Sequence, residues 1–144
     1  LNLQGRVFMQ PIDCPFRRAD EELLLMQGSP VLVDIHAEAT SEKRALALYL
    51  DGRVTAVFGT HTHVQTADEG ILDGGTAYIS DVGMTGGHSG VIGMDEEAII
   101  YRFLTGMPTR FEVCKSDLRM DAVAVEIDEA SGRSLSITRL SMKL

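Results

Sequence analysis

Basic runs are missing from this sequence. Lysine and arginine together number 13 against 21 aspartate and glutamate residues, so the formal net charge is −8. Proteins that bind the phosphate backbone of nucleic acids or an anionic membrane surface normally have the opposite balance. The composition therefore argues against a general nucleic-acid or membrane-surface module. It leaves room for a small phosphorylated substrate, because a bound divalent metal can dominate the local field.

Cysteines and long apolar runs are also scarce. Cys14 and Cys114 are the two cysteines, and neither has a second cysteine or a histidine at the spacing of a metal site. We therefore expect reduced thiols in a cytoplasmic protein. No apolar run approaches the ~20 residues of a membrane span, and no charged start followed by an apolar stretch marks a signal peptide.

The length of 144 residues and a hydrophobic content of 44% suit one domain with a normal core. Residues 31–36 and 54–58 are apolar runs typical of buried parallel strands, and residues 40–50 between them have a helical pattern. This strand-helix-strand unit predicts an α/β fold. The first residue is a leucine inside a strand-like stretch, residues 1–9, which we interpret as a sign that the sequence is a fragment.

Further elements are expected on both sides of this unit. The acidic residues from Asp20 onward predict the start of a helix that ends near Gly28. The remaining expected elements are strands at 71–72 and 76–82, a helix at about 95–104, and strands at 110–115, 122–127 and 134–140, the last two forming a hairpin.

Three histidines follow the two buried strands. His36 ends the first strand, while His61 and His63 follow the second. Ligands of open α/β sheets gather at this edge, and two side chains at positions i and i+2 point the same way if the backbone stays extended. Imidazole nitrogens suit zinc, manganese or iron. The pattern predicts a metal site, whereas each histidine alone would more often be a hydrogen-bonded structural residue.

Carboxylates flank the first of these histidines. Asp34, His36 and Glu38 alternate along the chain, so Asp34 and Glu38 could accept the second N–H of a metal-bound imidazole. The alternatives are that Asp34 pairs with a backbone amide and that Glu38 begins a turn. His88 lies in a glycine-rich stretch, and we expect a loop residue outside the cluster.

Residues 34–43, 59–69 and 74–84 resemble the YmdB family of metallophosphoesterases, and the resemblance extends over nearly the whole chain. It implies an incomplete α-β-β-α metallophosphoesterase-like sandwich with a carboxyl-terminal antiparallel hairpin, so that residues 1–144 would be the carboxyl-terminal portion of one domain. The resemblance also implies a two-metal centre that hydrolyses small phosphodiesters such as 2′,3′-cyclic nucleotides.

The same resemblance implies that His36, His61 and His63 are metal ligands. The parent enzyme would hold two divalent ions, iron or manganese with zinc as an alternative, and this chain at most one weakly held ion. The other ligands and the general acid would come from an amino-terminal half, so we assign no catalytic residue here. We expect the chain to be impaired as an enzyme, and to form homo-oligomers or associate with the missing half.

Two other functions compete with this interpretation. One is a noncatalytic oligomerising or regulatory domain with a vestigial metal site. The other is an amidohydrolase, suggested by the His-x-His element alone, but that class needs a much longer barrel.

Overall fold

The computed structural model describes residues 1–26 and 28–144, and the strands of this part form two sheets. The first sheet has the order β1-β2-β3-β5-β4, and the second has the order β6-β7-β8. Along the chain the elements are β1 (Asn2–Gln4), α1 (Pro15–Leu25), β2 (Leu32–His36), α2 (Thr40–Leu50), β3 (Ala56–Thr60), β4 (Gly70–Ile71), β5 (Ala77–Ile79), β6 (Thr85–Gly87), α3 (Glu96–Thr105), β7 (Leu118–Ile127) and β8 (Ser134–Lys143).

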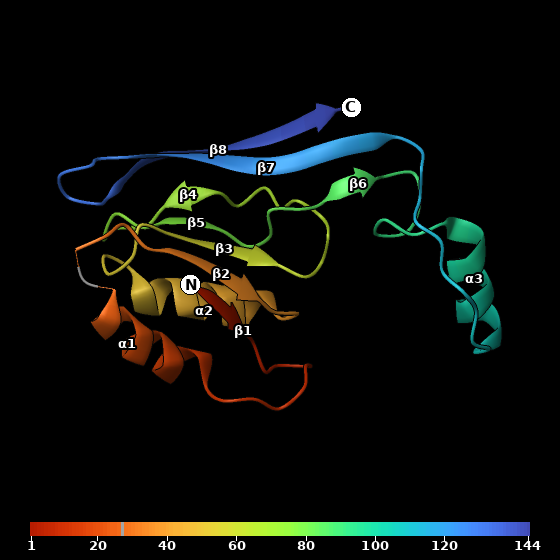
Figure 1. Ribbon diagram of the computed structural model, residues 1–144, viewed down its shortest axis with the longest axis horizontal. Coiled ribbons are helices and arrows are strands. Elements are labelled where there is room, and N and C mark those ends of the chain that lie inside the picture. Colours follow the sequence, from red (N-terminus) through yellow and green to blue (C-terminus); the bar gives the residue numbers. More distant parts are fainter. Residues whose placement is uncertain (27) are drawn as a thin grey trace.

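Three layers stack on one another (Figure 1). α1 and α2 cover one face of the first sheet, and the long β7–β8 hairpin covers the other face. β1, β2, β3 and β5 are parallel, whereas β4 joins β5 antiparallel. The expected α/β class and the carboxyl-terminal antiparallel hairpin are confirmed. The layers correspond to the helix, sheet and sheet of the predicted α-β-β-α sandwich.

The core lies around the first sheet, because its central strands direct apolar side chains toward α1 and α2. Val33 and Ile35 of β2 and Val57 of β3 are fully buried, and Leu46 and Leu50 of α2 belong to the same cluster. These contacts hold β2 and β3 in fixed register. The carboxyl ends of the two strands are therefore a rigid platform for side chains.

Reciprocal hydrogen bonds join the hairpin to the first sheet. Thr55 donates its hydroxyl to the carbonyl oxygen of Gly132 at 2.9 Å, and Ser134 donates its hydroxyl to the carbonyl oxygen of Thr55 at 2.8 Å. Further along, the side-chain amide of Gln65 donates to the carbonyl oxygen of Ala122 in β7 at 2.9 Å. The hairpin is thus joined to the first sheet just before β3 and again in the loop that follows β3.

The amino-terminal strand is shorter than expected. The amide of Gly5 still donates to the carbonyl oxygen of His36 at 2.9 Å, but the chain then turns away from the sheet. The carboxylate of Glu42 in α2 accepts hydrogen bonds from the amides of Arg6 and Val7, at 3.0 and 3.1 Å. The prediction of a strand over residues 1–9 is wrong beyond β1. The amides that follow β1 bind the carboxylate of Glu42 instead of a neighbouring strand.

Two other expected elements differ. α1 begins at Pro15 rather than near Asp20, since proline suits the first turn of a helix, where its missing N–H would have no partner. Residues 110–115 alternate like a strand but make an isolated bridge, between Met94 and Val113. This segment runs beside α3 without a continuous strand partner.

α3 stands apart from the two sheets (Figure 1). Capping interactions at its two ends fix where this helix begins and ends. The Asp95 side chain accepts from the amide of Glu97 at 3.1 Å, and Gly106 ends the helix with a φ of 69°. Phe103 and Leu104 are 84% and 80% exposed. None of the helices in the described residues is long and apolar enough to cross a membrane.

Candidate functional site

Two histidine rings meet at the carboxyl ends of β2 and β3. His36 ends β2 in register with Thr60, the last residue of β3, so His61 begins the next loop beside it. The Nδ1 atom of His61 lies 3.0 Å from Nε2 of His36, and the ring planes are perpendicular with centroids 4.8 Å apart. The parallel pairing thus brings together two imidazoles from adjacent strands.

A chain of hydrogen bonds sets the tautomer of His36. Thr60 donates its hydroxyl to Oδ1 of Asp34 at 2.9 Å, and its oxygen can then accept from Nδ1–H of His36 at 3.1 Å. Asn2 donates from Nδ2 to the other oxygen of Asp34 at 2.7 Å, which holds that carboxylate in place. With its hydrogen on Nδ1, His36 presents the lone pair of Nε2 to His61.

Glu38 fixes the tautomer of the other ring, that of His61. Its Oε2 atom lies 3.0 Å from Nε2 of His61, and because a carboxylate only accepts, the hydrogen of His61 lies on Nε2. The lone pair of His61 Nδ1 then faces that of His36 Nε2, an arrangement that favours a cation between them. Two ligands about 2.1 Å from one ion, on neighbouring vertices of an octahedron, lie about 3.0 Å apart. The spacing of the two nitrogens fits a shared metal ion.

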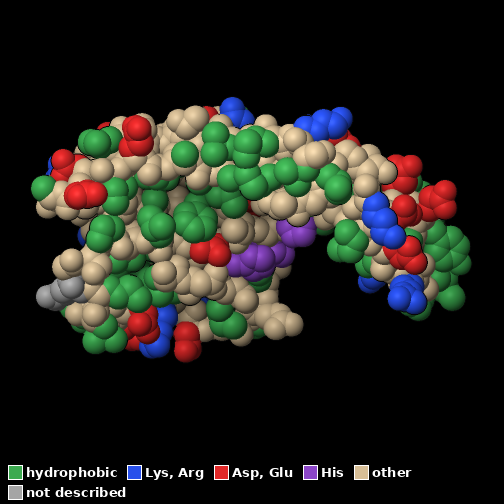
Figure 2. Space-filling view, turned by 45° about the horizontal axis from the view of Figure 1, so that its top comes forward, with side chains coloured by type: hydrophobic (Ala, Val, Ile, Leu, Met, Phe, Trp, Pro, Cys, Tyr) green, Lys and Arg blue, Asp and Glu red, His purple; other side chains and the backbone are tan. Residues whose placement is uncertain are grey.

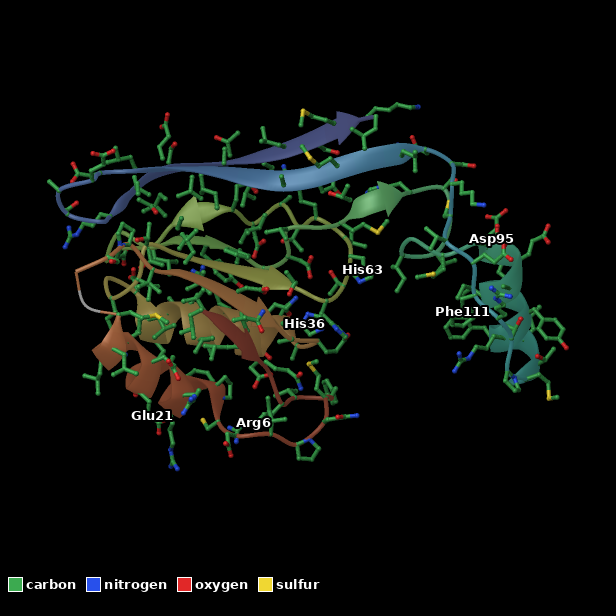
Figure 3. The ribbon with its side chains drawn as sticks, in the orientation of Figure 1. Arg6, Glu21, His36, His63, Asp95 and Phe111 are labelled. Atoms are coloured by element: carbon green, nitrogen blue, oxygen red, sulfur yellow. The ribbon has the colours of Figure 1, made fainter. Side chains whose placement is uncertain are left out.

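His63 lies at the same edge of the sheet as His36 (Figure 3). The backbone from His61 to His63 is not extended as the prediction for this pair had required. Its φ is 105° at His61 and 63° at His63, both in the region that residues other than glycine usually avoid. Nδ1 of His63 donates to the carbonyl oxygen of Ile92 at 2.9 Å, which leaves Nε2 as the acceptor. A backbone carbonyl on the far nitrogen is typical of a metal-ligating histidine.

A buried ion pair supports this loop from below. Nζ of Lys43 lies 3.0 Å from Oδ2 of Asp81, and the two side chains are 0% and 1% exposed. The same Oδ2 atom accepts from the amide of Thr62 at 3.0 Å, and Oδ1 accepts from the amide of Gly83 at 3.0 Å. The carboxylate of Asp81 therefore anchors the residue between His61 and His63.

The structure brings two of the three predicted metal ligands into contact, His36 and His61, and places His63 on the neighbouring loop. Among the described residues no three His, Cys, Asp or Glu side chains are arranged around one metal position. Asp34 reaches His36 through Thr60, and Glu38 contacts His61 rather than His36. The assignment of metal ligands stays a prediction.

The histidines are accessible from outside. In Figure 2 histidine side chains gather beneath the antiparallel sheet, on the wall of a hollow that faces the α3 lobe. A pocket of about 650 Å³ adjoins the pair and is lined by Gln4, Phe8, Met9, Gln10, Pro11, His36 and His61. The site can therefore admit a small molecule, with the loop after β1 as one wall.

The family is decided by a match over residues 1–140 to the family described as YmdB-like protein. The chain belongs to the YmdB-like family. Over 142 residues it is 51% identical to a 2′,3′-cyclic-nucleotide 2′-phosphodiesterase of Bacillus subtilis, a match that covers 97% of this chain and 54% of the relative. A putative phosphatase/phosphodiesterase of Mycoplasma pneumoniae is 45% identical over 115 residues, which cover 79% of this chain and 41% of that one.

Two solved structures share the fold of this YmdB-like chain. A hypothetical protein from Thermus thermophilus superposes with a TM-score of 0.92 at 45% identity, over 99% of this chain and 56% of that one. A phosphatase from Mycoplasma pneumoniae gives a TM-score of 0.91 at 39% identity, over 99% and 52%. The chain spans about half the length of the curated relatives it matches.

Several contributors to the site were not predicted from the YmdB-like sequence. Lys43 had a detectable signal, because it shares one face of α2 with Leu46 and Leu50 at helical spacing, where a lysine must find a buried partner. Thr60, at the end of an apolar run, gave no signal of its own. No sequence pattern indicated the carbonyl oxygen of Ile92 that accepts from His63, because every residue has a backbone carbonyl group.

Proposed function

We propose that this chain is the carboxyl-terminal part of a metal-dependent phosphodiesterase domain, acting on small phosphodiesters such as 2′,3′-cyclic nucleotides. One observation carries the proposal: Nε2 of His36 and Nδ1 of His61 face each other at 3.0 Å at the carboxyl edge of a parallel sheet. The similarity to the 2′,3′-cyclic-nucleotide 2′-phosphodiesterase of Bacillus subtilis supports the substrate class.

His36, His61 and His63 would hold a divalent transition metal, iron or manganese with zinc as the alternative. A metal held there would supply a Lewis acid for a phosphoryl oxygen and a source of hydroxide at neutral pH. The protein's own part is to hold protons at fixed atoms. Thr60 keeps the hydrogen of His36 on Nδ1, and Glu38 keeps that of His61 on Nε2.

Three imidazoles can hold at most one ion, with positions left for water or a carboxylate. A two-metal mechanism needs both ions to bind phosphoryl oxygens. We infer that the remaining ligands and the general acid come from a part of the protein outside these 144 residues, and that this chain alone is a weak phosphodiesterase. The free thiols of Cys14 and Cys114 suit a cytoplasmic location.

The experiment compares the 144-residue chain with a form extended upstream, each assayed with manganese or iron and a 2′,3′-cyclic nucleotide. We expect turnover from the extended form and little from the chain alone. His36→Ala in the extended form should abolish turnover, whereas Arg133→Gln, at the opposite end of the sheet, should leave it unchanged. Equal turnover of the two forms, or none from the extended form, would contradict the proposal.

A noncatalytic association domain is the second candidate, favoured by the apolar residues that the chain exposes. Ile100, Phe103 and Leu104 share one face of α3 and are 51%, 84% and 80% exposed. Surfaces of this kind commonly mark protein contacts. We expect the chain to self-associate or to bind the missing half. A monodisperse monomer of the chain at micromolar concentration would count against association.

A further inference from the structure

A second pocket lies beside His63. Its volume is about 430 Å³, within the range of roughly 300–1,000 Å³ typical of small-molecule sites. Met84 and Ile92 contribute apolar walls, and His88 and Asp121 contribute polar ones. His63 belongs to this pocket and to the predicted metal ligands, so the two sites are adjacent.

His88 is held in one orientation. Its Nδ1 atom lies 3.0 Å from the carbonyl oxygen of Gly86, and its Nε2 atom lies 3.1 Å from Oδ2 of Asp121. The side chains of His88 and Asp121 are 19% and 8% exposed. Both ring nitrogens are therefore engaged by oxygen atoms of the protein, so neither is free to bind a ligand. What the ring offers a ligand is its flat carbon surface.

Asp121 is fixed in turn by its surroundings. Gly83, with a φ of 83°, lies so close that a Cβ atom there would come within 2.7 Å of Oδ2 of Asp121. The amide of Asp121 donates to the carbonyl oxygen of Met84 at 3.1 Å. The wall formed by His88 and Asp121 is thus preorganised, and a ligand need not order it.

The charges that line the pocket are already paired. Any charge on His88 is balanced by Asp121, and Arg119 forms an ion pair with Asp117 at 2.6 Å. A phosphate needs unpaired donors or cations, so this pocket does not suit one. A flat, uncharged group with polar edges fits better, because it can lie against the thioether of Met84 and the ring of His88.

We propose that this pocket is a nucleobase subsite, in which the base lies between His88 and the apolar wall of Met84 and Ile92, while the phosphodiester lies at His63. The proposal rests on the proposed function for its substrate class. Bases stack on flat aromatic side chains, histidine included, with little dependence on sequence. The subsite would make the protein prefer nucleotides over phosphodiesters without a base.

The first test uses adenosine, which has no phosphate and needs no metal. Binding to the upstream-extended protein is followed by the NMR signal of the Met84 methyl group. His88→Gln removes the ring but keeps a donor for Asp121, and we expect adenosine to bind on the order of tenfold more weakly. His88→Phe keeps a flat ring and should retain the affinity. Arg133→Gln, in the pocket at the opposite end of the sheet, is the control.

Adenosine that leaves the Met84 signal unmoved would overturn the subsite. So would wild-type affinity in His88→Gln, provided that its thermal unfolding shows a folded protein.

The second test separates the subsite from the proposed function. We expect His88→Gln to raise KM for a 2′,3′-cyclic nucleotide about tenfold and to leave glycerol 1,2-cyclic phosphate, which has no base, unaffected. Equal losses on both substrates would overturn the subsite and leave the phosphodiesterase intact. If the wild-type protein cleaves neither substrate but binds adenosine at Met84, the function is wrong and the base site stands.

Discussion

Replacing Lys43 by methionine tests the anchor of the metal-site loop. The substitution keeps the apolar volume of the side chain but leaves Asp81, 1% exposed, as a buried carboxylate without its cation. Breaking a buried ion pair in this way typically costs about 3–5 kcal/mol of unfolding free energy. For a chain of this length the loss corresponds to a fall in Tm of roughly 10–17 °C.

The assay is urea and thermal unfolding followed by circular dichroism. Lys143→Met is the matched control, because Lys143 is 76% exposed in its ion pair with Asp117 and its loss should change stability by about 0.5 kcal/mol or less. Adding Asp81→Asn to Lys43→Met should recover part of the loss, since it removes the unpaired charge. A loss below about 1 kcal/mol for Lys43→Met would refute the reasoning.

Two further predictions concern Gly59 in β3 and Asp68 in the loop before β4. Gly59→Ala should prevent correct packing of β3, because the new Cβ atom would overlap the carbonyl oxygen of Ser80; a folded variant with wild-type Tm would contradict this. Burial opposes ionisation of Asp68, but hydrogen bonds from Ser80 and Thr66 outweigh it and lower the pKa of this carboxyl below its ordinary value of 3.8. The stabilisation is therefore complete above that value and is lost as pH falls through the lower pKa of the folded state. Asp68→Asn should reduce the acid sensitivity of Tm below about pH 4, and an unchanged profile would exclude this carboxyl as the cause.

Much of the fold was predictable because its signals are local. The apolar runs of β2 and β3 and the helical pattern of α2 place His36 and His61 at one edge of the sheet, as expected. The alternation of β7 and β8 likewise predicts their hairpin. Local patterns of this kind need no knowledge of distant contacts.

The parts that were not predicted depend on distant partners. The bend at His61 and His63 arises where Asp81 binds the amide of Thr62, a contact between separate loops that no local pattern indicates. Residues 110–115 have the alternation of a strand but no continuous partner strand, and alternation alone cannot supply one. The sequence therefore predicts which residues form the site, but the conformation of these residues depends on tertiary contacts.

A metal ion shared by His36 and His61 is central to the proposed function. Anomalous diffraction at the manganese edge, from crystals of the chain soaked in manganese chloride, tests it most directly. We expect one peak between Nε2 of His36 and Nδ1 of His61, and its loss in His36→Ala crystals. Wild-type crystals with no peak within ligand distance of these two nitrogens would contradict the shared ion.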